Sequence, residues 1–102
     1  MNRELRFADE IFCDLQEIAC YLQRQDARLS PRFRVGYTQT CQWIARNPFA
    51  GRVRKGLRPE GLRGRAVFGF PRHFIFYLVD DDSVIILRVL HGSRDLTQVF
   101  ND

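Results

Sequence analysis

The chain has 102 residues, 45% hydrophobic and 27% charged, which is the composition of a folded domain with a single core. We therefore expect one domain over residues 1–102. No apolar run approaches the roughly 18 residues that a membrane helix needs, and no apolar segment follows the charged N-terminus as in a secretory signal. These absences predict a soluble, cytoplasmic protein without a membrane partner.

The net charge of +4 is distributed unevenly along the chain. Residues 1–45 carry six Arg and six acidic residues, whereas residues 46–72 carry eight basic residues against Glu60 alone. Residues 73–102 are net −3, from two Arg and five acids. Fifteen of the sixteen basic residues are Arg, the side chain suited to bidentate pairing with carboxylate or phosphate. The middle third is therefore expected to face an anionic partner.

Three cysteines, Cys13, Cys20 and Cys41, form no CxxC pair. Cys13 and Cys20 are seven residues apart in an expected helix, so they lie about 10 Å apart along its axis, beyond the roughly 7 Å Cα limit for a disulfide. We expect all three to be reduced, half-buried core residues of a cytosolic protein. His73 and His91 show no ligand spacing relative to them, so neither a metal nor a cofactor is expected.

The first half of the chain predicts a strand and two helices. Leu5 and Phe7 alternate with charged residues, as in a short amphipathic strand. Asp9 is a suitable N-cap for a helix of about fifteen residues, because apolar residues then recur at helical spacing. Ser30 and Pro31 predict the start of a second helix, as N-cap and first helical residue, and residues 47–48 (NP) end it. The two helices should form an antiparallel hairpin.

The second half predicts a sheet. Residues 48–62 are rich in Gly, Pro and Arg and predict a basic loop. Strands are expected over residues 65–70, 73–79 and 84–91, with turns at residues 71–72 and 80–83. Residues 94–100 predict one or two helical turns. The order β-α-α-β-β-β indicates an α+β fold, with the helical hairpin on one face of a small, mainly antiparallel sheet and the other face only partly covered.

Several segments carry a resemblance to a known family. They are residues 14–18 (DLQEI), 21–22 (YL), 47–48 (NP), 51–52 (GR), 62–63 (LR), 70–72 (FPR) and 75–77 (IFY), and above all 86–96 (ILRVLHGSRDL). In this order, over residues 5–97, they resemble ParE-type toxins of the RelE/ParE superfamily of type II toxin–antitoxin systems.

The resemblance implies the RelE/ParE-like fold and a toxin neutralised by a ParD-like antitoxin, whose C-terminal segment wraps the toxin in a system of the kind that stabilises plasmids. ParE-type toxins usually inhibit DNA gyrase and so block replication, whereas RelE-type toxins cut mRNA on the ribosome. Both share one fold, so the fold does not choose between them. We expect a protein inhibitor of DNA gyrase and not an enzyme. A RelE-like ribosome-dependent endoribonuclease and a non-toxic, antitoxin-binding homologue are the alternatives.

Cleavage of mRNA needs a base, an acid and cations for the developing phosphorane charge. Nearby acid–base candidates are Glu60, His91 and Asp95, beside the arginines of the strands. RelE-like nucleases also use C-terminal side chains, but residues 97–102 contain no Tyr, His or Lys, and the chain ends on an acid. We therefore expect no catalytic residues.

The arginines are the candidate binding residues for the antitoxin or the target. In the basic loop they either are solvated or dock an acidic partner. No aromatic residues interleave with them, so direct sequence-specific DNA binding is not expected. The candidate partner-binding set is Arg52, Arg54, Arg58, Arg63, Arg65, Arg72 and Arg88, with Lys55 beside the loop arginines.

Two further positions carry charge in unusual surroundings. Arg88 interrupts an apolar strand, where an unpaired buried charge is costly, so it either points to solvent or pairs with Asp95 or an antitoxin acid. His91, Arg94 and Asp95 cluster at the end of that strand. We favour an ion pair that pins the tail over a catalytic role. Trp43, beside the stripe of the second helix, either covers the core edge or contacts a partner.

Overall fold

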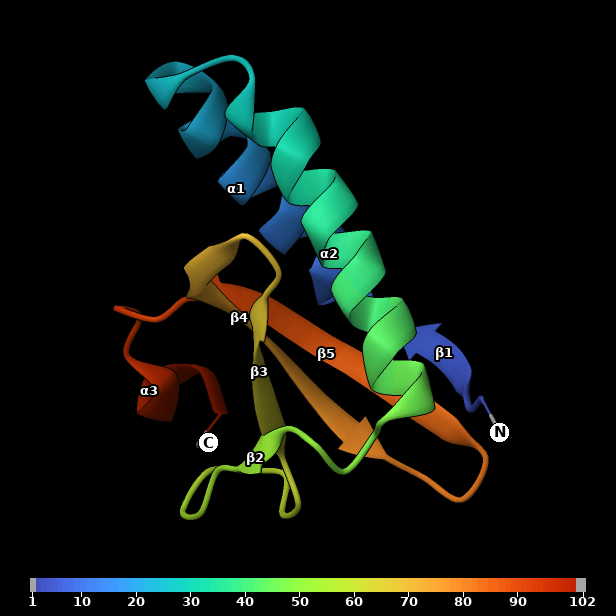
Figure 1. Ribbon diagram of the computed structural model, residues 1–102. Helices are drawn as coiled ribbons and strands as arrows, with labels where there is room; N and C mark the ends of the chain where they lie inside the picture. Colours follow the sequence, from blue (N-terminus) through green and yellow to red (C-terminus); the bar gives the residue numbers. More distant parts are fainter. Residues whose placement is uncertain (1, 101–102) are drawn as a thin grey trace.

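The computed structural model describes residues 2–100, in which two long helices pack on a five-stranded sheet (Figure 1). The sheet order is β1-β5-β4-β3-β2, with β1 parallel to β5 and the other neighbours antiparallel. This is the expected α+β fold. The elements are β1 (Glu4–Phe7), α1 (Glu10–Gln25), α2 (Leu29–Arg46), β2 (Arg52–Val53), β3 (Arg63–Val67), β4 (Phe70–Val79), β5 (Ser83–His91) and α3 (Leu96–Phe100).

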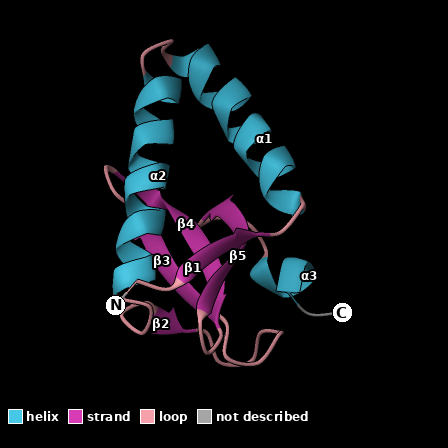
Figure 2. Cartoon of the chain, turned by 90° about the vertical axis from the view of Figure 1, so that its right-hand side faces the viewer, coloured by secondary structure: helices cyan, strands magenta, loops and turns pink. Residues whose placement is uncertain are grey.

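Helix α2 begins two residues before the expected position. Its first turn follows a tight bend in which the Asp26 carboxylate accepts a hydrogen bond from the backbone N–H of Arg28 (2.9 Å), and Leu29 N–H donates to Asp26 O (2.9 Å). The expected N-cap at Ser30 is therefore wrong. Pro31 still lies in the first turn, where its missing N–H leaves no hydrogen bond unmade. From this bend α1 and α2 diverge toward the sheet (Figure 2).

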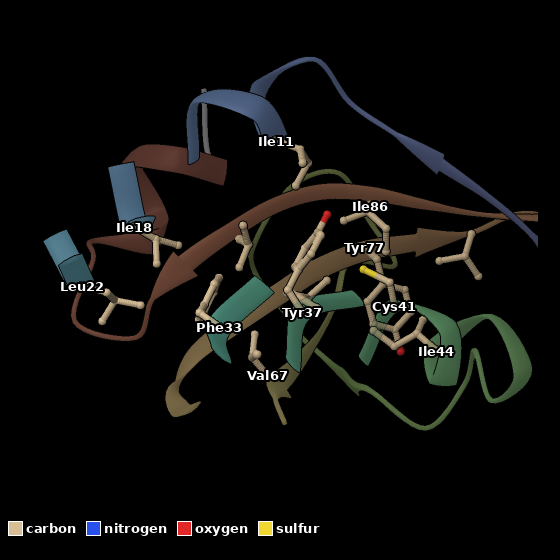
Figure 3. Close-up of a cluster of buried hydrophobic side chains, with 13 residues drawn as sticks. Ile11, Ile18, Leu22, Phe33, Tyr37, Cys41, Ile44, Val67, Tyr77 and Ile86 are labelled. Carbon is tan, nitrogen blue, oxygen red and sulfur yellow. The ribbon is translucent and has the colours of Figure 1, made fainter. Parts of the chain in front are cut away.

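The main core lies between the helical hairpin and the sheet (Figure 3). The expected helical stripes provide most of it, because residues three and four apart share one face of a helix. The sheet contributes Tyr77, which is fully buried in this core. Its hydroxyl donates to Pro48 O (2.8 Å) and accepts from Gly51 N–H (3.0 Å), so it holds the chain that leaves α2.

The turn between β3 and β4 lies at Phe68 and Gly69, not at the expected residues 71–72. Gly69 has a φ of 81°, a backbone conformation that tight hairpins need and that glycine adopts without steric cost. Pro71 instead lies within β4. The register of β3 against β4 shifts there, so the missing N–H of Pro71 interrupts no regular pairing.

The face of the sheet opposite the long helices is better covered than expected. Phe76 points to this face because its neighbours in β4, Ile75 and Tyr77, belong to the main core. Helix α3 and the loop between β2 and β3 lie over it, and Phe100 is buried there. Arg58 N–H donates to Phe100 O (2.7 Å) and joins the loop to α3. Residues 48–62, expected to be a loop, therefore contain the short strand β2. They also cover a second small core on this face of the sheet.

No helix in the described part of the chain combines the length and apolar character needed to cross a membrane.

Candidate functional site

Arg88 is paired inside the protein, and its partner is Asp14 of α1. The guanidinium donates from Nε to Asp14 Oδ2 (2.7 Å) and from an Nη to Oδ1 (2.8 Å), and the backbone N–H of Val89 donates to the same carboxylate (3.1 Å). These bonds raise the pKa of Arg88, so the guanidinium stays charged. The expectation that Arg88 is paired is therefore confirmed, but the candidate partner Asp95 is wrong. Asp14 falls on the apolar stripe between Ile11 and Ile18, and this placement was the sequence signal for a buried partner.

This ion pair lies beside a groove between α1 and the ends of β4 and β5. The lining is apolar at Ile18, Val89 and Leu90, and several polar side chains surround these residues. The full lining is Asp14, Glu17, Ile18, Tyr21, His73, Val89, Leu90, His91, Ser93 and Arg94. A groove that combines apolar, aromatic and charged side chains is the kind of surface that an amphipathic peptide segment fills.

The two histidines meet in the groove. Their rings are 5.1 Å apart at an angle of 85°, an edge-to-face contact. His73 is buried, and burial lowers its pKa, with a further lowering from the neighbouring His91. The backbone N–H of Ser93 donates to His91 Nδ1 (3.1 Å). In neutral His91 the ring proton is therefore on Nε2.

The tail that follows does not contain the expected ion pair. Asp95 instead accepts hydrogen bonds from Thr97 Oγ1 (2.6 Å) and Thr97 N–H (3.2 Å), and thus caps the start of α3. The hydrogen bond from Thr97 lowers the pKa of Asp95. Within the described residues neither His91 nor Arg94 forms a salt bridge with it. The predicted cluster of His91, Arg94 and Asp95 therefore separates into two parts: His91 and Arg94 line the groove, and Asp95 caps α3. Residues 101–102, the end of the acidic tail, lie outside the described residues.

Two arginines of β3 are packed against aromatic rings on the helix side of the sheet. The guanidinium of Arg65 lies 4.3 Å from the ring centre of Trp43, and that of Arg63 lies 5.2 Å from Phe49. An Nη of Arg63 also donates to Phe49 O (3.1 Å) and Gly51 O (2.8 Å). These rings come from α2 and the turn after it, and they contact arginines of β3. The expectation of no interleaved aromatic residues was made for the basic loop, where, among the described residues, Arg54 alone lies over a ring, that of Phe76. Arg63 is partly structural, and Trp43 covers the core edge.

The remaining candidate arginines lie in separate places. Arg52 lines a shallow hollow together with Arg65. Arg54 lies over the Phe76 ring at 5.8 Å and, with Arg58, lines a hollow inside the β2–β3 loop. Arg72 is exposed at the start of β4. The structure therefore brings the middle-third charges onto two sides of the sheet and not into one site.

The acid–base candidates are also dispersed. Glu60 lines the hollow of the β2–β3 loop, His91 lines the groove, and Asp95 caps α3. Within residues 2–100, no group of three or more His, Cys, Asp or Glu side chains is arranged to hold a metal ion.

The cysteines are free thiols. Cys41 is buried, and burial raises the pKa of its thiol to about 12. Cys13 and Cys20 are exposed on α1, so the expectation that all three are half-buried core residues is wrong. The helical pattern already placed both outside the stripe of α1.

The fold and the groove define a small α+β protein with an internal ion pair and a surface suited to a peptide partner. The chain matches the sequence model of the ParE toxin of the type II toxin–antitoxin system parDE, over residues 5–96. It belongs to this family and is a toxin of a type II system.

Two solved structures have a similar fold. One is described as the chromosomal ParDE toxin–antitoxin system from P. aeruginosa, with a TM-score of 0.71 and 15% identity over 87% of this chain and 95% of that one. The other is a conserved hypothetical protein from Helicobacter pylori, with a TM-score of 0.58 and 22% identity over 90% of this chain and 97% of that one. Among curated proteins, none matches significantly.

Proposed function

We propose that this toxin is neutralised by a ParD-like antitoxin and acts by binding and inhibiting DNA gyrase, without catalysis of its own. The observation that carries the proposal is the family match over residues 5–96, which covers every long element of the fold. A cytoplasmic location follows from such a target.

The groove between α1 and β5 is the proposed antitoxin site. Ile18, Val89 and Leu90 beneath it are buried, so its exposed lining comes mainly from aromatic and polar side chains. These would contact one face of an amphipathic segment, whose removal from water favours binding. Acidic residues of the antitoxin could then pair with the exposed Arg52, Arg72 and Arg94 and with the half-buried Arg65, where charge-assisted hydrogen bonds fix the register. Arg94 on the groove rim and Arg72 near it would bind acids at one end of the antitoxin segment. Arg52 and Arg65, which line the hollow at β3, would bind acids further along it.

The dispersed acid–base groups support action by binding. Cleavage of mRNA would need a base, an acid and cations around one phosphate. Here Glu60 lines the hollow of the β2–β3 loop, His91 lines the groove, and Asp95 is engaged with Thr97. Exposed arginines such as Arg52, Arg58 and Arg72 are instead suited to contact an acidic protein surface.

The target is tested by two assays run side by side on the purified toxin. We expect inhibition of DNA supercoiling by purified gyrase, relieved by the antitoxin that the adjacent reading frame encodes, and no cleavage of mRNA on programmed ribosomes. Cut mRNA with unaffected gyrase would establish the RelE-like alternative. Tight antitoxin binding with neither effect would identify a non-toxic homologue.

The antitoxin surface is tested by charge reversal of Arg52, Arg65 and Arg72 together, measured as antitoxin affinity by calorimetry. Arg63 is left intact because it holds the turn after α2, so its loss would disturb folding. The control reverses the exposed Arg6, Arg32 and Arg34, which changes the net charge equally. We expect weaker binding for the first variant alone. Equal weakening of both would mean that only net charge matters.

A further inference from the structure

The outer face of α1, away from the core, carries an unusual set of exposed side chains. Phe12 and Tyr21 are 67% and 54% exposed, and Cys13 and Cys20 are exposed between them. A shallow hollow follows this face. Its lining is Phe12, Cys13, Gln16, Glu17, Cys20 and Arg24. Glu17 and Tyr21 lie at the border between this face and the groove, whereas Phe12, Cys13 and Cys20 lie outside the groove, the ion pair and the buried core.

We propose that this face binds the same face of a second copy of the chain, with the two α1 helices antiparallel. The side chains of the face are arranged symmetrically about one point, midway between Gln16 and Glu17. Cys13 and Cys20 are equally far from this point, and so are Asp9 and Arg24. A two-fold axis at this point places each residue level with its counterpart on the partner helix. A closed two-fold dimer is the commonest symmetric assembly.

The cysteines set the centre of the contact. Residues seven apart on a helix differ by only about 20° in direction, so Cys13 and Cys20 lie on one line along α1. Their small side chains let two helices approach at the usual axial distance of about 8–10 Å. With Cα atoms about 2.3 Å from each axis, facing residues then have Cα atoms roughly 3.5–5.5 Å apart. Much of that range is compatible with a disulfide.

The charges at the ends of the face are complementary in the antiparallel arrangement. Asp9, and Glu10 beside it, are exposed at the start of α1, and Arg24 is exposed in its last turn. None of these three forms a salt bridge within the described residues. In the dimer each Arg24 lies level with the acids of the other copy. A parallel arrangement would instead bring like charges together at both ends.

Other residues set the limits of the interaction. Phe12 and Tyr21 point to opposite sides of the cysteine line, where they cover the flanks of the contact. Glu17 lies next to the two-fold axis, so the two Glu17 carboxylates approach each other and repel. One helix face of 16 residues, about 24 Å long, is also a small interface, so the dimer should form reversibly and depend on concentration.

The test uses the two thiols as reporters. A diazene oxidant converts two thiols to a disulfide by accepting their two electrons and two protons, and itself becomes a hydrazine. We expect the native chain to form intermolecular bonds between Cys13 and Cys20, identified by mass spectrometry of the peptides. The variants Cys13→Ser and Cys20→Ser should form dimers at least tenfold more slowly, since like residues are about 10 Å apart along the axis.

Charge variants test the same antiparallel arrangement without disulfide formation. In sedimentation equilibrium, Arg24→Asp should raise the dissociation constant, and Asp9→Arg together with Arg24→Asp should restore dimerisation. Glu17→Gln should lower the dissociation constant. Equal cross-linking of the single-cysteine variants, preferred Cys13–Cys13 bonds, or a monomer at all concentrations whatever the charge variant would overturn the proposal. These outcomes are measured on the toxin alone, without gyrase or antitoxin, so they are distinguishable from a failure of the proposed function even though Glu17 and Tyr21 also line the groove.

Discussion

The ion pair between Asp14 and Arg88 joins α1 to β5, and its two members are buried to different degrees. The Asp14 side chain is 3% exposed and the Arg88 side chain 24% exposed. Arg88→Met therefore leaves the more buried charge without its partner, with only Val89 N–H bonded to it. Breaking a buried pair in this way costs about 3–5 kcal/mol. We expect a loss in this range for Arg88→Met.

Asp14→Asn should cost less, about 1–3 kcal/mol, because the amide oxygen can still accept from Val89 N–H and Arg88 can turn toward solvent. The double variant should be more stable than Arg88→Met alone, since it leaves no buried charge. The two changes are thus not additive.

Urea unfolding followed by circular dichroism measures these differences. With a slope of about 1–3 kcal/mol per molar, a loss of 3 kcal/mol lowers the midpoint by about 1–3 M. Arg6→Met, which removes an exposed pair with Glu4, should leave the midpoint unchanged within error. The reasoning is refuted if Asp14→Asn costs more than Arg88→Met, or if the double variant shows the sum of the single losses.

The remaining predictions concern other buried groups. Tyr77→Phe leaves the Gly51 N–H without its acceptor, so we expect a loss of about 1–3 kcal/mol by urea unfolding. Gly36→Ala should lower the melting temperature, because the new methyl group would clash with the backbone oxygen of Phe68. In the control Gly56→Ala the methyl group meets no neighbouring atom, so only the strain of its positive φ should lower the melting temperature. Burial lowers the pKa of His73, so below about pH 6.5 the unfolded chain binds more protons than the folded one and stability falls as the pH decreases. His73→Phe should reduce this fall between pH 7.5 and 5.5, measured by the urea midpoints. A thiol reagent at pH 8 should titrate two thiols in the native protein and three in denaturant, because burial raises the pKa of Cys41 to about 12.

Local patterns in the sequence determined the order and type of the elements. The apolar stripes of the two helices and the apolar runs of β4 and β5 supply most of the buried residues, because a face repeats every 3.6 residues in a helix and every two in a strand. Phe12 is nevertheless exposed and Asp14 is buried. The position of the β3–β4 turn was missed, since the need for a positive φ at Gly69 outweighed the turn tendency of Pro71. The match of residues 5–96 to the ParE family agrees with the resemblance found in the same segments.

Contacts between distant segments were decided by the tertiary structure alone. Arg88 pairs with a residue 74 positions away, and Arg65 contacts Trp43 only because α2 packs against β3. A sequence shows that such charges need partners, since an unpaired buried charge is costly, but it does not show which side chains fold to within hydrogen-bonding distance. The partner is chosen by how the helical hairpin packs on the sheet, and that packing follows from the sum of many apolar contacts.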